Sequence, residues 1–255
     1  MSQWHEMGSM TSVEFREALP GIEIALMPVG ATEQHGPNLA LATDYVVAHR
    51  YAQKLASRLH PRAVVVPPIP FGVSQHHTGF AGTITLSPET FAAVCMDTAR
   101  SLARDGIRHV LLVNGHNGNM GALNVIATRM RYELDVKAAV SFYFAQAADR
   151  VKAHGRTKRY GHACEIETSV LLHLAPELVR RDALEPGDMI GQERALHFNN
   201  QPFALTVPIP FHEQTRNGVF GDARLASEEI GQDVVETALE RTVSFVESFL
   251  ASEDG

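Results

Sequence analysis

The sequence lacks the features that mark secreted, membrane-spanning and disulfide-stabilised proteins. Its 255 residues include two cysteines, Cys95 and Cys164, which do not form a disulfide framework. Its apolar runs are much shorter than the roughly 20 residues that span a bilayer. The N-terminus, MSQWHEMGSM, has no charged segment followed by an apolar core, so it does not resemble a secretion signal. We therefore expect a cytoplasmic protein.

Positive charge is also scarce. The net charge is −7, and the sequence has one basic cluster, made of Arg156, Lys158 and Arg159, which argues against nucleic acid or a membrane surface as the main partner. The chain is 45% hydrophobic and 20% charged, an ordinary composition for a globular protein. A chain of this length can build one complete α/β domain. We expect a single domain over residues 1–255 that acts on a small molecule or a peptide.

Strand-like and helix-like patterns alternate along the chain. Short apolar runs precede segments whose apolar residues recur at helical spacing. The predicted strands cover residues 22–29, 63–66, 109–113 and 136–144, and the predicted helices begin near residues 44, 87, 121 and 225. This order predicts an α/β fold with a mostly parallel sheet and helices on both faces. The stretch 180–216 is irregular, and we expect extended chain there, over the sheet edge.

The first chemical motif is GATEQHGPNLALATD, residues 30–44, which directly follows the first predicted strand. Glu33 and His35 are two residues apart, so an extended backbone directs both side chains to the same side. A glycine-proline pair then lets the chain turn back and bring Asp44 toward the same point. Carboxylate and imidazole groups at the carboxyl end of a strand indicate a metal site. In the alternative interpretation, the three residues are a helix-capping carboxylate, a loop histidine and a separate N-cap.

The second motif, NGHNGN at residues 114–119, follows the predicted strand 109–113. Because the carboxyl ends of parallel strands meet at one edge of a sheet, we expect His116 to point into the same crevice as the first motif. The glycine-rich turn has an alternative interpretation as an anion-binding loop at a helix N-terminus. However, it lacks the Lys-Ser/Thr pair of a P-loop and the glycine spacing of a dinucleotide fingerprint.

The third motif, GHACEIETS at residues 161–169, places His162, Glu165 and Glu167 at the start of an apolar helix. Only one of the two glutamates need reach the metals, and residues two apart on a helix point about 200° apart. The alternative is that both glutamates simply favour the helix dipole.

These three motifs, together with GVSQHHTGFAGTITLS and NGVFGDARLASEEIG, resemble the creatininase (creatinine amidohydrolase) family over nearly the whole chain. The resemblance implies a creatininase-like three-layer α/β/α fold. It also implies a metal-dependent hydrolase that acts on C–N amide bonds other than ordinary peptide bonds. Subunits of this family commonly assemble as hexamers, so we expect a homo-oligomer.

The resemblance further implies two divalent metal ions. Glu33 and His116 would hold one ion, His35 would hold the other, and Asp44 would bridge them. Carboxylate and imidazole ligands accept Zn²⁺, Mn²⁺ or Fe²⁺ and do not choose among these metals.

A fifth ligand needs a separate assignment. Creatininase carries a glutamate two residues after the histidine of NGH, where this chain has Gly118. We assign Glu165 as the replacement, both as a metal ligand and as a catalytic residue, and we give Glu167 a supporting position. An additional carboxylate is favoured because it offsets the excess positive charge of two ions.

The implied reaction is hydrolysis by a water that the two ions activate. We assign His162 to carry a proton to the leaving nitrogen, and His77 and Asn117 to bind the substrate. For His77 the alternative is a loop histidine satisfied by backbone groups. Creatininase closes its pocket with tryptophans, whereas the single tryptophan here, Trp4, lies outside every motif. We therefore expect a small cyclic amide, a formamide or a short peptide as the substrate rather than creatinine itself.

Two other functions use a similar ligand set. A dinuclear phosphoesterase usually adds lysine or arginine for the phosphoryl charge, and the three motifs contain neither residue. A non-catalytic metal-binding protein would close its coordination sphere and leave no open position.

Overall fold

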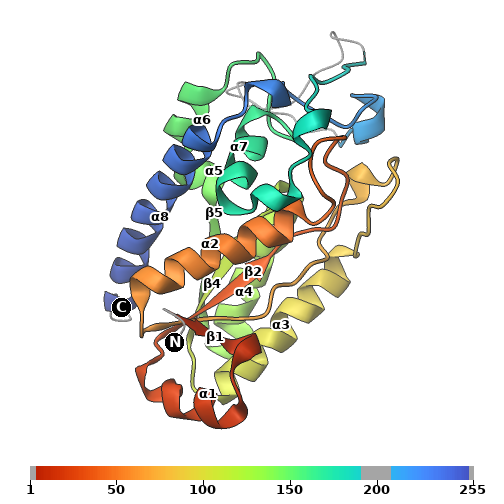
Figure 1. The fold of residues 1–255 in the computed structure, drawn as a ribbon. Helices are drawn as coiled ribbons and strands as arrows, with labels where there is room; N and C mark the ends of the chain where they lie inside the picture. The colour runs from red at the N-terminus through yellow and green to blue at the C-terminus, as the bar shows by residue number, and fades with distance from the viewer. Residues whose placement is uncertain (1–3, 191–207, 253–255) are drawn as a thin grey trace.

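The computed structural model describes residues 4–190 and 208–252 of the chain (Figure 1). Its centre is a five-stranded sheet in the order β1-β3-β2-β4-β5, and each neighbouring pair is parallel. Val29, Asn114 and Phe142 are aligned at the ends of β2, β4 and β5, so the loops after these strands leave the sheet at one level. The strands are β1 (His5–Glu6), β2 (Ile24–Val29), β3 (Ala63–Val65), β4 (His109–Asn114) and β5 (Lys137–Phe142).

Helices cover both faces of this sheet (Figure 1). They are α1 (Ser12–Ala18), α2 (Thr43–Leu59), α3 (Pro88–Arg104), α4 (Met120–Leu134), α5 (Tyr143–Gln146), α6 (Ala148–His154), α7 (Glu165–Leu174) and α8 (Glu228–Ala251). Successive residues of β2 face opposite sides, as the period of a strand requires. Ile24 and Leu26 join the core under α2, α7 and α8, whereas Ala25 and Met27 join the core under α3 and α4. The predicted three-layer α/β/α fold is confirmed.

Local sequence explains where several helices begin. α3 starts after Ser87, whose hydroxyl accepts a hydrogen bond from the Thr90 N–H at 3.1 Å, and proline fits the first helical position. α8 starts after Ser227, which caps the helix in the same way. In contrast, the residue before α2 is Ala42, which offers no side-chain cap. The carboxylate of Asp44, in the first turn of α2, therefore does not serve as the N-cap of that helix.

The predicted elements are present with shifted ends, and the structure adds others. β5 ends at Phe142, before the predicted end at residue 144, because Tyr143 begins the short helix α5. The sequence patterns did not predict β1 or α1. Part of the segment predicted as extended, residues 191–207, lies outside the described residues, and the described parts include 3-10 turns at Arg181–Ala183 and Phe211–Glu213. Among the described residues, no helix combines the length and the hydropathy that a membrane crossing requires.

Candidate metal centre

The loops after β2 and β4 pack closely against the first turn of α2. The Gly115 N–H donates to the carbonyl oxygen of Val29 at 2.9 Å. A Cβ on Gly30 would lie 2.3 Å from the backbone nitrogen of Tyr45, and a Cβ on Gly115 would lie 2.1 Å from the carbonyl oxygen of Asp44. Both positions therefore require glycine, because any side chain would push α2 away from the sheet edge. This close approach carries Asp44 to the two loops.

Five side chains meet at this edge, and we call them the ligand cluster: Glu33, His35, Asp44, His116 and Glu167. All five are buried, with at most 8% of each residue exposed. Asp44 lies at the centre, since its Oδ1 is 3.1 Å from His35 Nε2 and its Oδ2 is 3.1 Å from His116 Nδ1. Glu33 Oε1 is 3.3 Å from His116 Nδ1, and Glu167 Oε2 is 4.0 Å from His35 Nε2. The predicted convergence of Glu33, His35, Asp44 and His116 is thus present in the geometry.

Several atoms of the ligand cluster have no hydrogen bond within the described residues. They are both carboxylate oxygens of Glu33, Oδ2 of Asp44 and Nε2 of His35. Burying a carboxylate without a hydrogen-bond partner costs several kcal/mol. Glu33, His35 and Asp44 also bring ligand atoms within 4.8 Å of one another, as do His35, His162 and Glu167. Among the described residues, these atoms form ion-pair contacts only within the site's own carboxylates and histidines. Such oxygen and nitrogen ligands bind divalent transition metals, so the residues fit the implied metal centre.

The carboxylates dominate the electrostatics of the ligand cluster. Burial opposes protonation of His35, yet the carboxylates of Asp44, Glu167 and Glu33 raise its pKa to about 10. Burial also opposes protonation of His116, but Glu33 and Asp44 hold its pKa well above the usual value. Burial, together with Asp44 and Glu33, raises the pKa of Glu167 to about 7, against the opposing effects of His35 and a backbone N–H. A buried site with this excess of negative charge attracts a cation.

Glu165 does not reach the ligand cluster. Its Oε1 accepts hydrogen bonds from the N–H groups of Arg156 and Thr157, each at 3.1 Å, and from the Thr157 hydroxyl at 2.8 Å. Its Oε2 accepts from the Asp222 N–H at 3.0 Å. Backbone and hydroxyl donors take both oxygens of Glu165, so the structure does not bring this predicted ligand to the ligand cluster. The glutamate that faces the site is Glu167.

The backbone at Gly118 leaves no room for a side chain. A Cβ there would lie 2.3 Å from His116 Nε2, 2.6 Å from the carbonyl oxygen of Val73 and 2.7 Å from His76 Cε1. The half-buried ring of His76 stacks on that of His116, with centroids 5.6 Å apart. The sequence motifs did not predict a role for His76, although its place beside His77 in a long loop could have indicated one. His76 and His116 thus occupy the space that a carboxylate side chain at position 118 would need.

His77 and His162 flank Glu33, and Gln34 orients both of them. The Gln34 amide donates to His77 Nδ1 at 2.9 Å, which leaves the ring proton of neutral His77 on Nε2, 3.4 Å from Glu33 Oε1. His162 Nε2 lies 2.8 Å from the carbonyl oxygen of Gln34 and 3.0 Å from its side-chain amide nitrogen, and His162 Nδ1 faces Glu33 Oε1 at 3.9 Å. Burial and the nearby His35 lower the pKa of His162 well below its usual value. His162 is therefore a neutral base beside the ligand cluster.

A pocket of about 500 Å³ opens above the ligand cluster, and we call it the cluster pocket. His77, His116, His162 and the exposed Asn117 lie along one side of it. Other lining residues come from α5 and α6, which lie at this end of the sheet (Figure 1). The structure thus brings the predicted substrate residues His77 and Asn117 to a single opening.

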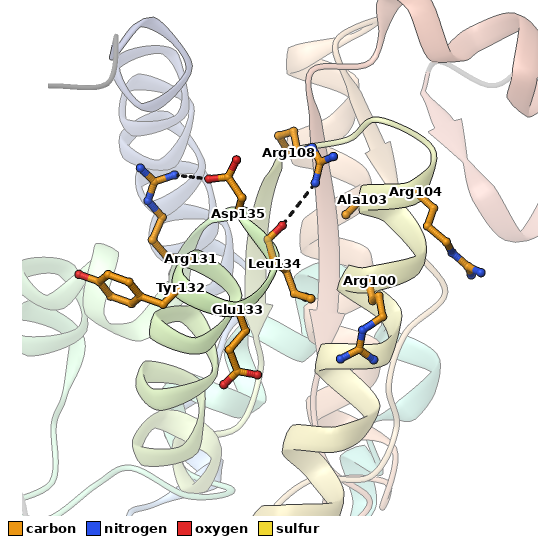
Figure 2. A pocket seen from close by; sticks show the side chains of 9 residues that line it. All are labelled: Arg100, Ala103, Arg104, Arg108, Arg131, Tyr132, Glu133, Leu134 and Asp135. Atoms are coloured by element: carbon orange, nitrogen blue, oxygen red, sulfur yellow. Dashed lines mark hydrogen bonds and ion pairs between the residues drawn. The ribbon is translucent and has the colours of Figure 1, made fainter.

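A second hollow of about 840 Å³ lies elsewhere, between the ends of α3 and α4, and we call it the arginine groove. Figure 2 shows its lining, which includes Arg100, Arg104, Arg108 and Arg131. Arg108 and Asp135 precede the first residues of β4 and β5, so the arginine groove lies at the opposite end of the strands from the ligand cluster. None of the predicted site residues lines it.

Known proteins are similar to this chain over most of its length. The sequence model of the creatininase family, described as creatinine amidohydrolase, matches residues 8–246. A mycofactocin precursor peptide peptidase from Mycobacterium ulcerans is 32% identical over 259 residues, which cover 98% of this chain and 94% of that relative. A 3-dehydro-scyllo-inosose hydrolase from Thermotoga maritima is 28% identical over 249 residues, or 91% of this chain and 79% of that relative. The crystal structure of a candidate creatinine amidohydrolase from Bacteroides fragilis has a TM-score of 0.83 at 25% identity and covers 99% of both chains.

Proposed function

This chain belongs to the creatininase family, and from that premise we propose that it is an amidohydrolase that uses two divalent metal ions to cleave a C–N amide bond. The observation that carries the proposal is the set of buried oxygen and nitrogen atoms of Glu33, His35 and Asp44 that lack hydrogen bonds. Of these residues, Glu33 lines an open pocket, as do the cluster residues His116 and Glu167. An open position is what distinguishes a catalytic metal site from a structural one.

The positions of the ligands support two ions. The two oxygens of Asp44 face different histidines, His35 and His116, each at 3.1 Å, as a bridging carboxylate would. Glu33 stands on the side of His116 and Glu167 on the side of His35. We assign Glu33 and His116 to one ion, His35 and Glu167 to the other, and Asp44 to both.

The residues around the ligand cluster would supply proton transfer and substrate binding. When bound, two divalent ions would lower the pKa of a shared water and polarise the amide carbonyl. His162 is buried, its lowered pKa keeps the ring neutral, and its Nδ1 faces the ligand cluster 3.9 Å from Glu33 Oε1, so we assign it to take the proton of the attacking water and deliver it to the leaving nitrogen. His77 lines the pocket, with its Nε2 3.4 Å from Glu33 Oε1, so we keep it as a substrate-binding residue. Asn117, exposed on the pocket wall, is placed to contact the substrate.

The size of the cluster pocket favours substrates larger than creatinine. Pockets of roughly 300–1,000 Å³ enclose drug-sized ligands, and the cluster pocket has about 500 Å³. One relative is named for a peptide substrate and another for an inosose, so substrates differ among similar chains. We propose a formamide or a short peptide, with a small cyclic amide as the third class to test.

The test combines metal analysis with an amide screen. Protein stripped of metal by a chelator should lose amide hydrolysis and regain it with Zn²⁺, Mn²⁺ or Fe²⁺, and elemental analysis should find two ions per chain. A phosphodiester in the same screen checks the phosphoesterase alternative. Full amide hydrolysis after exhaustive metal removal would sink the proposal, as would turnover of the phosphodiester alone.

We also propose that the chain assembles as a homo-oligomer, with a hexamer expected from the family. Light scattering on size-exclusion fractions gives the mass directly. A monomer mass of about 28 kDa at all micromolar concentrations would contradict this assembly.

A further inference from the structure

Many of the residues that line the cluster pocket are apolar. Phe142 and Phe144, at the end of β5 and in α5, stack with ring centroids 5.8 Å apart. On the other side Phe211 packs on His77, with centroids 4.3 Å apart, and on His162, with centroids 4.8 Å apart. An aromatic surface therefore continues from the pocket wall to the histidines of the site. Such a lining favours a substrate with a large apolar or aromatic body.

One cation interrupts this apolar lining. Lys152 of α6 is the only lysine or arginine among the described residues of the lining. The only aspartates or glutamates among them are Glu33 and Glu167 of the ligand cluster. Lys152 is exposed, and no ion pair joins it to a carboxylate in the described part of the chain. The carboxylates near it in sequence are already paired, since Asp149 accepts from Arg241 and Asp233 accepts from His154. Lys152 thus presents a solvated positive charge at the rim of the pocket.

The two ends of the pocket differ in charge in a way that orients a ligand. Among the lining residues, the carboxylates of Glu33 and Glu167 are buried, whereas Lys152 is exposed. A substrate that carries both an amide and a carboxylate would place its carboxylate at Lys152, because a free carboxylate and an ammonium group form a charge-assisted hydrogen bond. Its amide would then extend toward the ligand cluster, and its apolar body would lie against the phenylalanines.

We propose that the cluster pocket selects amides that combine an aromatic or large aliphatic body with a free carboxylate, and that Lys152 binds this carboxylate. The inference rests on the proposed amide hydrolysis and names its substrate class. Lys152 is a specificity residue in this scheme: it contacts the substrate carboxylate and not the scissile bond. Its loss should therefore raise KM for acidic substrates and leave kcat nearly unchanged.

The experiment compares matched substrates on the metal-loaded enzyme. Formyl-phenylalanine and alanyl-phenylalanine are each supplied as the free acid and as the C-terminal carboxamide, and formyl-alanine replaces the aromatic body. The wild type should prefer each acid over its carboxamide by about tenfold in kcat/KM, the size of a charged hydrogen bond. It should also prefer formyl-phenylalanine over formyl-alanine by at least about tenfold.

Two lysine variants separate the binding of the substrate carboxylate by Lys152 from a general effect of removing one positive charge. Lys152→Met should lose the preference for the acids through KM, with turnover of the carboxamides within about twofold of the wild type. Lys158→Met removes the same charge from a lysine that lies outside the cluster pocket and should behave as the wild type. Equal turnover of acid and carboxamide by the wild type would overturn the proposal. So would a Lys152→Met variant that loses activity equally on acids and carboxamides, or a Lys158→Met variant that loses the preference for acids as Lys152→Met does. Equal turnover of formyl-alanine and formyl-phenylalanine by the wild type would overturn the proposed preference for a large apolar body.

A binding measurement keeps this inference separate from the proposed function. 3-Phenylpropanoate and 3-phenylpropan-1-ol contain no amide, so calorimetry measures their binding whether or not the enzyme cleaves amides. The carboxylate should bind about tenfold more tightly than the alcohol, and Lys152→Met should remove the difference. If no amide in the series were hydrolysed, the proposed function would fail while this result still supported the binding of carboxylates by Lys152. Equal binding of the two probes would overturn the inference even if amides were cleaved.

Discussion

The cluster pocket and the arginine groove lie at opposite ends of the same parallel strands, and their charges are satisfied in different ways. In the arginine groove the charged groups are exposed and have partners inside the chain: Arg131 pairs with Asp135 at 3.1 Å, and Arg108 donates to the carbonyl oxygen of Leu134 at 3.3 Å (Figure 2). At the cluster pocket the carboxylates are buried, and those of Glu33 and Asp44 keep oxygens without hydrogen bonds in the described structure. The groove has about 840 Å³ and the pocket about 500 Å³.

This difference shows that volume is a poor guide to the site. Exposed ion pairs contribute about 0–1 kcal/mol each, so the arginine groove can form on a surface without any ligand. Buried carboxylates without partners destabilise a fold, and folded proteins keep such groups mainly at functional sites. The unsatisfied oxygens of Glu33 and Asp44 therefore indicate function more strongly than the larger hollow does. Substitutions at the two ends of the sheet should separate these two kinds of charge.

The largest effect should come from neutralising the buried carboxylate of Asp44, with the exposed carboxylate of Asp135 at the other end of the strands as the control. Asp44→Asn removes the charge that we assign to both metal ions, so metal content should fall and amide turnover should drop by about a thousandfold or more, since metal ions contribute several kcal/mol to such reactions. Asp135→Asn makes the same chemical change in the arginine groove and should leave both quantities unchanged. Elemental analysis and kcat/KM are the measurements. An Asp44→Asn protein with two ions and normal turnover would show that the buried carboxylate has no metal role.

A smaller effect should distinguish the two glutamates of α7. Glu167→Gln should weaken one metal ion and reduce turnover by about 10–100-fold, the range found when a group that supports a metal is lost. Glu165→Gln should retain both ions and instead lower the free energy of unfolding by about 1–3 kcal/mol, because an amide oxygen replaces a carboxylate that accepts from Thr157 and Asp222. Metal titration and thermal unfolding measure the two outcomes. Loss of a metal in Glu165→Gln, with Glu167→Gln unaffected, would restore the original assignment of Glu165.

The same pair of glutamates shows how far sequence reasoning reaches. Motif spacing and strand order predicted that Glu33, His35, Asp44 and His116 meet at one sheet edge, because parallel strands end together. The 200° separation of two helical positions correctly required that Glu165 and Glu167 point apart, but it could not say which one faces the site.

The backbone just before α7 decides that choice. Ala163 takes a φ of +50°, which is uncommon for a residue with a side chain. Its N–H donates to Glu167 Oε2 at 2.5 Å and so fixes Glu167 on the side of His35. Lys152 and Phe211 were missed for a different reason: they lie outside every motif, and only the packing of α6 and of the turn Phe211–Glu213 brings them to the pocket.

The smallest effect should come from the arginine groove itself. Arg108→Met keeps much of the side-chain length and removes the hydrogen bond to the carbonyl oxygen of Leu134. Arg108 is exposed, so water can replace the lost donor, and the free energy of unfolding should change by less than about 1 kcal/mol. Amide turnover and metal content should stay within error of the wild type, because the ligand cluster lies at the other end of the strands. Denaturant unfolding and the amide assay measure both quantities on one preparation. A large loss of turnover in Arg108→Met, with the fold intact, would mean that the arginine groove takes part in function. Charges with hydrogen-bond partners and charges without them would then no longer distinguish the two ends of the sheet.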